Sequence, residues 1–177
     1  TPLFSYTSAG TSALGLGHVQ GGISDQGLTG VTKIGYEITA SALSAGQVVE
    51  VAIYAVVNGM LAAQLWSTTL VGDTVGGFHK TLPSTLNMPR SPVAIVALNP
   101  YNNAGSVTLR SALPTRPACV AISSVYADRR GFGVDTTLTV LPASFSGWKW
   151  NLSSSYATSH FGLGDGISGC PLLTGVA

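Results

Sequence analysis

Apolar and polar residues alternate at a period of two through much of this chain, which is the pattern of half-buried β-strands. The alternation is clearest in the segment 47–57, where one face of the predicted strand is apolar and carries Val49, Val51, Ile53, Ala55 and Val57. Glu50 and Tyr54 fall on the opposite face. Asn58-Gly59 follows as a turn signal, and a second apolar run continues to Leu70, so the segment 47–70 predicts a β-hairpin.

The length of the hairpin loop decides which face the second strand buries. A two-residue turn places Gln64 on the apolar face. A three-residue loop with Gly59 in the left-handed conformation places Ala63 and Leu65 there and leaves Trp66 outside. Because a slip of one residue turns every side chain to the other face, the apolar pattern favours the three-residue loop.

Further apolar runs predict a series of short strands separated by Gly, Pro, Ser and Asn. Strands are expected over 31–40, 76–82, 93–98, 106–110, 118–122 and 136–141, and irregular connections over 83–92, 99–105 and 126–133. The run VAIVAL at 93–98 is apolar on both faces, which indicates a central strand covered on both sides. No segment repeats apolar residues at helical spacing over three turns.

These elements predict an all-β protein, a two-sheet β-sandwich of jelly-roll type. Residues 1–30 are glycine-rich with scattered hydrophobes, so we expect an extended N-terminal lead-in with one short strand around 13–20. Such a lead-in could wrap a neighbouring subunit or lie along the edge of the sandwich. Residues 31–177 are expected to form a single jelly-roll domain.

The composition restricts the possible partners. Charged residues make up only 8% of the 177 residues and 45% are hydrophobic, so we expect the chain to be folded rather than disordered. A surface with so few charges favours association into a homo-oligomer, most naturally a trimer, or into a particle lattice. The net charge is +1 without a basic tract, which argues against nucleic acid as a partner. No apolar run approaches the roughly 20 residues that membrane insertion through a helix requires.

The cysteines allow two interpretations. Cys119 lies in the apolar run 118–122, which favours a buried free thiol. A disulfide between Cys119 and Cys170 would instead close a loop of roughly 50 residues and could contribute about 3–4 kcal/mol. Their spacing does not fit a zinc site, and we expect neither a metal nor a cofactor.

The order of the predicted strands resembles a known module. The run TKIGYEITASALSAGQVVEVAIYAVVNGMLAAQLWSTTL, with its Ile53-Tyr54 motif, the run VAIVALN and the short strand at 108–110 resemble a domain near the C-termini of tailed-phage tail fibres, tail spikes and related virion adhesins. The resemblance covers about residues 31–141. It implies a jelly roll, usually trimeric, displayed on the virion surface and often used in host attachment. It implies no fixed set of binding residues.

Catalytic and metal-binding patterns are weak in this sequence. Nucleophilic hydrolysis needs Ser or Cys beside His, but no G-x-S-x-G elbow occurs and the histidines are scattered: His18, His79 and His160. Asp128 and Asp135 are the one carboxylate pair near a single loop that could serve glycoside hydrolysis, although Asp in turns commonly bonds its own backbone. The segment 162–166 could offer oxygens to calcium, or be a glycine-rich turn. We therefore expect no enzyme.

Glycan recognition fits the loops better. It needs an aromatic face for stacking and polar side chains for hydroxyl groups, presented by loops on a rigid scaffold. The candidate ligand-binding residues are Tyr101, Asn102, Asn103, Tyr126, Asp128, Arg129, Arg130 and Trp148. Trp148 could instead pack in the sandwich or at a subunit contact.

The sequence thus predicts a non-enzymatic virion-surface adhesion domain that binds a host-surface receptor, a glycan or a protein, and assembles with other virion proteins. One alternative is a structural capsid, head-fibre or decoration component. Another is a carbohydrate-binding module of a secreted enzyme.

Overall fold

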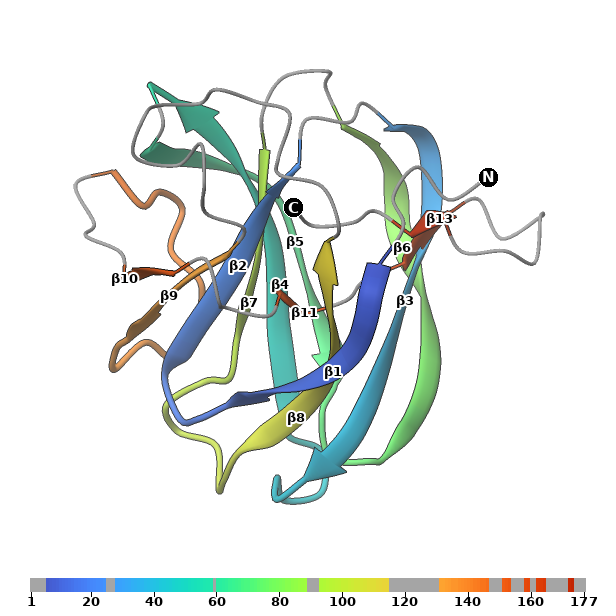
Figure 1. Ribbon diagram of the computed structural model, residues 1–177, viewed down its shortest axis with the longest axis vertical. Coiled ribbons are helices and arrows are strands. Elements are labelled where there is room, and N and C mark those ends of the chain that lie inside the picture. Colours follow the sequence, from blue (N-terminus) through green and yellow to red (C-terminus); the bar gives the residue numbers. More distant parts are fainter. Residues whose placement is uncertain are drawn as a thin grey trace.

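The computed structural model describes most of the chain. The described residues are 6–24, 28–58, 60–88, 93–114, 131–146, 151–153, 158–159, 162–164 and 172–173. Within them the protein is all-β, and its strands form two antiparallel sheets that face each other as a β-sandwich (Figure 1). The expected fold class is confirmed at this level.

Each sheet is built from strands that are distant in the sequence. The first sheet contains β1 (Tyr6–Leu14), β3 (Leu28–Ser41), β6 (Gly76–Met88), β8 (Val107–Pro114), β11 (Thr158–Ser159), β12 (Gly162–Gly164) and β13 (Leu172–Leu173). The second sheet contains β2 (His18–Ser24), β4 (Val48–Val57), β5 (Met60–Val71), β7 (Val93–Leu98), β9 (Gly131–Asp135) and β10 (Asn151–Ser153). In the first sheet β1, β8 and β3 are neighbours in that order and β6 pairs with β3, whereas the second sheet has the order β10-β9-β2-β7-β4-β5.

Several connections gather at one end of the sandwich because the chain repeatedly crosses between the sheets. The turns after β1, β3, β5 and β7 all lie at the end where Leu14 pairs with Val107 and Val48 with Val71, at the bottom of Figure 1. We call this surface the loop end. It comprises residues 15–17, 42–47, 72–75, 99–106 and 135–138.

The main core lies between the two sheets, where the inward residues of the alternating strands meet. Tyr36 and Ile38 of β3 contribute from the first sheet, and Val49, Val51 and Ile53 of β4 from the second. All these side chains are buried, which confirms the period read from 31–40 at Tyr36 and Ile38 and that read from 47–57 as far as Ile53. Of the two further residues expected on the buried face, Ala55 is half-buried and Val57 is 54% exposed. Burial of each such side chain contributes about 1.5–3 kcal/mol relative to exposure.

A second core covers the outer face of the second sheet. Phe145 and Leu141 lie against Tyr54 and Val96, and the rings of Tyr54 and Phe145 are 4.7 Å apart between centroids. We call residues 136–146 the covering segment. The expectation of a strand over 136–141 is wrong, because this segment crosses the sheet as a third layer; among its residues Ser144 alone makes an isolated bridge, to Ala63.

The covering segment also changes the environment of β4 and β7. Tyr54, expected on a half-exposed face, has no exposed surface. All six residues of β7 are buried, which confirms that strand 93–98 is covered on both sides. Hydrogen bonds fasten the segment: Leu141 N–H donates to Glu50 Oε2 at 2.6 Å, and Tyr54 Oη donates to the Pro142 carbonyl at 2.6 Å.

The hairpin loop differs from the expected one. Val57 pairs with Met60, so the loop has two residues, and Asn58 takes the left-handed conformation at φ 52°. Two later irregularities in the pairing shift the register, so that Ile53 lies opposite Trp66. Trp66 therefore packs against the main core, while Leu65 is 49% exposed, the reverse of the expectation.

Proline does not end the sixth strand where the sequence predicted. β6 continues through Pro83 to Met88, in the segment expected to be an irregular connection. Among the described strands β6 pairs with β3 alone, so the missing proline N–H can face the unpaired side. β8 likewise continues to Pro114 at the end of its pairing with β1.

Residues expected to form a lead-in belong to the two sheets. β1 pairs with β8, and β2 lies between β7 and β9 in the second sheet. The predicted short strand at 13–20 contains the turn between these strands, with Gly17 at φ 68°. β2 carries Gly21 and Gly22, whose lack of side chains hides the alternation. Residues 131–133, expected in a loop, similarly belong to β9, and two of these three residues are glycine.

The predicted strand 118–122 and both cysteines lie outside the described residues. The described residues form no helix, hence none of the length and apolarity needed to cross a membrane.

Candidate functional site

The loop end is held together by a buried amide. Asn99 has no exposed surface, and its Nδ2 donates to the carbonyls of Leu14 at 3.0 Å and Gly105 at 2.9 Å. Its Oδ1 accepts a hydrogen bond from Asn103 Nδ2 at 2.7 Å. A buried amide with its donors and acceptor satisfied fixes the positions of the groups around it. Asn99 therefore connects both ends of the β7–β8 loop to the turn after β1.

Further hydrogen bonds extend this bracing to the β3–β4 and β5–β6 loops. Asn103 Nδ2 also donates to the Val48 carbonyl at 3.0 Å, and Gln47 Oε1 accepts from the backbone N–H of Ala104 at 2.9 Å. Asp73 Oδ2 accepts from the backbone N–H of Gly46 at 2.6 Å. The loops thus form one connected surface rather than independent segments.

Tyr101 projects from this braced surface. Its side chain is 50% exposed, and its backbone N–H donates to the Leu138 carbonyl at 2.8 Å. A Cβ placed on Gly17 would come within 3.0 Å of the Tyr101 ring and would collide with the Thr136 carbonyl, so this turn requires glycine at that position. The Tyr101 ring consequently lies beside the β1–β2 turn and the start of the covering segment.

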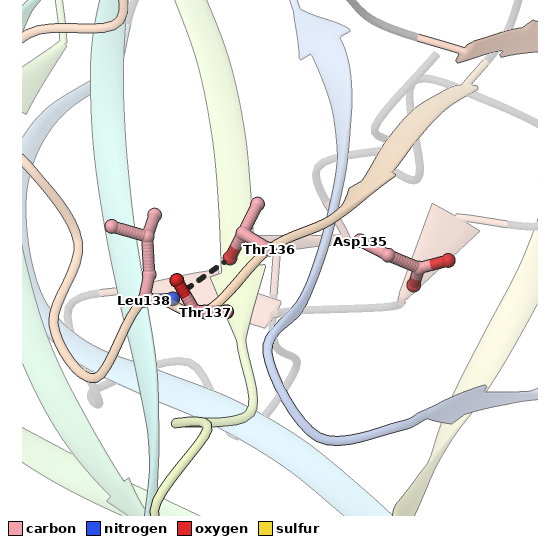
Figure 2. Close-up of a pocket in the computed structure, with 4 residues that line it drawn as sticks. All are labelled: Asp135, Thr136, Thr137 and Leu138. Atoms are coloured by element: carbon pink, nitrogen blue, oxygen red, sulfur yellow. Dashed lines mark hydrogen bonds between the residues drawn. The ribbon is translucent and has the colours of Figure 1, made fainter.

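A shallow open depression lies next to Tyr101. It is lined by Asp135, Thr136, Thr137 and Leu138 (Figure 2). Thr136 Oγ1 donates to the Gly17 carbonyl at 2.8 Å and accepts from Leu138 N–H at 3.1 Å, which fixes the course of the backbone here. Figure 2 shows the Asp135 carboxylate at one end of the depression, pointing away from Leu138 at the other.

The Asp135 carboxylate lies within hydrogen-bond distance of His18 and accepts from its Nδ1 when that nitrogen carries a proton. The distance from His18 Nδ1 to Asp135 Oδ1 is 2.7 Å. The His18 side chain is 20% exposed and the Asp135 side chain is 89% exposed. The imidazole therefore orients the carboxylate from the protein side, while most of the carboxylate faces solvent.

The second aspartate at the loop end has a different environment. Both oxygens of Asp73 accept hydrogen bonds, one from Gly46 N–H and the other from Thr74 Oγ1 at 3.0 Å. The Gly46 N–H holds the pKa of Asp73 below its usual value, with the Thr74 hydroxyl as the next cause. Asp73 is thus engaged in holding the loops, whereas Asp135 presents a carboxylate outward.

The structure brings together part of the predicted site. Tyr101 and Asn102 are exposed on the loop end as expected. Asn103 is half-buried, and its Nδ2 donates to the Val48 carbonyl and to Asn99 Oδ1, so its amide braces the loops. The remaining predicted ligand-binding residues lie outside the described residues: Tyr126, Asp128, Arg129, Arg130 and Trp148.

Sequence reasoning missed His18 and the depression beside Tyr101. Asp135 was considered only as a partner of Asp128 for glycoside hydrolysis, and Asp128 lies outside the described residues. His18 and Asp135 are separated by 117 positions, so no local motif joins them. Within the described ranges, no three or more His, Cys, Asp or Glu side chains gather in a way that could hold a metal ion.

Comparison of the chain with protein-family models, curated proteins and solved structures gives no match.

Proposed function

We propose that this chain is a non-enzymatic adhesion domain on a virion surface, of the kind carried by phage tail fibres and spikes, and that its loop end binds a host-surface receptor. The observation that carries this proposal is the environment of Tyr101. A half-exposed aromatic ring stands on a loop whose backbone is fixed by the buried amide of Asn99. Aromatic side chains on preorganised loops supply contact area with little loss of conformational entropy on binding.

The strand order supports a jelly-roll fold for this domain. The long strands of the first sheet are neighbours in the order β1, β8, β3 and β6, and those of the second in the order β2, β7, β4 and β5. Two interlocked Greek keys of eight strands have this arrangement. A jelly roll is compatible with many functions, so the loop end, and not the fold, supports the adhesion proposal.

The proposal includes a homotrimer. The chain has few charges, and apolar side chains of β5 and its hairpin are exposed: Val57, Met60, Leu65 and Val71. Large exposed apolar areas usually mark an interface. Light scattering on the purified chain should give three times the monomer mass of 18.0 kDa.

Binding to whole cells tests the adhesion proposal. The fluorescently labelled chain is incubated with a panel of bacterial strains that differ in surface polysaccharide. We expect binding to a subset of strains and its loss with Tyr101→Ala. Thr85→Ala is the control, because Thr85 is exposed but lies in the part of β6 toward Met88, at the end of the sandwich opposite the loop end and outside the proposed subunit contact. Binding that is equally sensitive to both substitutions, or absent from every strain, contradicts the proposal.

A structural virion component is the second candidate, and the same exposed residues of β5 favour it. Such a protein would bind its own particle and not cells. This candidate would be favoured over the first if the chain enters particles but does not bind cells. Leu65→Ala should then abolish assembly into the particle, and Tyr101→Ala should leave it unchanged.

A further inference from the structure

The charges of the loop end restrict the class of ligand that it can bind. Its residues 15–17, 42–47, 72–75, 99–106 and 135–138 include two aspartates and no lysine or arginine. The described lysines and arginine lie along strands: Lys33 is opposite Thr81 and Lys80 is opposite Ile34 in the β3–β6 pair, and Arg110 forms a two-point salt bridge with Glu37. The loop end is therefore a negative surface within the described structure.

Asp135 is the carboxylate that a ligand can reach. Asp73 has a hydrogen bond on each oxygen, whereas the Asp135 side chain is 89% exposed with His18 against one oxygen. A carboxylate held from behind by an imidazole is a fixed acceptor for hydroxyl or ammonium donors. Thr137 is exposed on the same stretch, and Leu138 supplies apolar surface at its other end.

We propose that the depression from Asp135 to Leu138, together with the Tyr101 ring, binds a neutral or amino-bearing saccharide and rejects acidic ones. The inference rests on the proposed adhesion function and specifies its ligand. Sugar hydroxyls or an ammonium group would donate to Asp135, and the apolar face of a sugar ring would lie on Tyr101. A uronate or other acidic sugar would place its carboxylate near that of Asp135, on a surface whose described residues include no lysine or arginine.

The test uses the whole chain on an array of immobilised oligosaccharides in four groups: neutral hexoses, N-acetylhexosamines, free amino sugars and acidic sugars. We expect binding among the first three groups and none among the acidic sugars. Asp135→Asn should weaken binding to the best saccharide roughly tenfold or more, since the amide keeps one oxygen acceptor but loses the negative charge that strengthens hydrogen bonds from the ligand. Tyr101→Ala should weaken it to a similar extent, roughly tenfold or more.

Asp73→Asn is the matched control for charge. It removes one negative charge from the same end, but at a carboxylate already used by Gly46 and Thr74. Saccharide binding should change less than about threefold with this variant, because Asp73 has no free role toward a ligand. Asp135→Lys should in addition create binding to acidic sugars. Since Asp135 is exposed, each of its variants should remain folded, which thermal unfolding checks.

The outcomes separate this inference from the adhesion proposal. The saccharide inference would be overturned if the chain preferred acidic sugars, or if Asp135→Asn left saccharide binding unchanged. The adhesion proposal would survive either result if Tyr101→Ala still abolished binding to cells. If the chain binds cells but no saccharide, the receptor is a protein, so the inference fails and the adhesion proposal stands. Absence of both saccharide and cell binding would overturn both proposals.

Discussion

Replacement of Asn99 by alanine should destabilise the protein strongly, although Asn99 is a polar residue in a loop. The side chain donates hydrogen bonds to Leu14 and Gly105 and accepts one from Asn103. Each lost hydrogen bond costs about 0.5–1.5 kcal/mol, so the three together cost roughly 1.5–4.5 kcal/mol. The upper half of this range is expected, because the residue has no exposed surface and water cannot easily replace it.

A loss of about 3 kcal/mol is a large part of the roughly 5–15 kcal/mol that stabilises an ordinary domain. Equilibrium unfolding in urea measures it, as a lower midpoint with an unchanged slope. Asn102→Ala is the control, since this neighbour in the same loop is exposed and should change stability by less than about 0.5 kcal/mol. If Asn99→Ala loses less than about 1 kcal/mol, or no more than Asn102→Ala does, the loop end is not braced as described.

The remaining predictions concern the covering segment. Phe145→Ala should destabilise the protein by about 3–5 kcal/mol in the same urea assay, because the ring is 1% exposed and packs on Tyr54; a loss below about 1 kcal/mol would mean that the segment is not docked. Burial raises the pKa of Tyr54 to about 12, so its phenol is protonated at neutral pH and donates to the Pro142 carbonyl. Tyr54→Phe removes this hydrogen bond and should lower the free energy of unfolding by about 1–3 kcal/mol, measured by calorimetry. An unchanged stability would mean that the hydrogen bond is absent. Burial also raises the pKa of Glu50, although the hydrogen bond from Leu141 N–H acts to lower it. The folded protein therefore holds this proton more tightly than the unfolded chain, and wild-type stability should fall relative to Glu50→Gln as the pH rises above about 4.5, the ordinary pKa of the group. A difference in stability between the two proteins that does not change with pH would contradict this.

The sequence alone predicts the parts of the fold in which burial follows a local period. Tyr36 and Ile38 of β3 and the whole of β7 are buried as their patterns indicate. The inner face of β4 is predicted as far as Ile53, whereas Val57, expected on the same face, is exposed beside the hairpin loop. In each case one strand carries the complete signal, so no knowledge of its neighbours is needed.

The rest of the fold depends on contacts between distant segments. The alternation of threonine with Leu138 and Val140 predicts a strand. The segment instead crosses the outer face of the second sheet, because β4 and β7 present apolar side chains on that face. The position of Trp66 depends on two register irregularities that leave no mark in the sequence. Either feature could be predicted only with the opposing strand already in place.

The candidate site was predictable only in part for the same reason. Tyr101 stands in a loop rich in turn residues, so its exposure followed from the sequence. The contact of its backbone with Leu138 and the pairing of His18 with Asp135 arise from the crossing of the covering segment. The residues that give the site its charge and its hollow could not be assigned without the fold.

Hydrogen–deuterium exchange of the full chain tests recognition by the loop end most directly. Exchange is compared with and without the saccharide that binds best on the array. Added protection should be confined to peptides that contain residues 99–106 and 135–138, and it should disappear in Tyr101→Ala. Protection found instead along β5 or in the β4–β5 hairpin, with the loop end unchanged, would contradict the proposed location of the site.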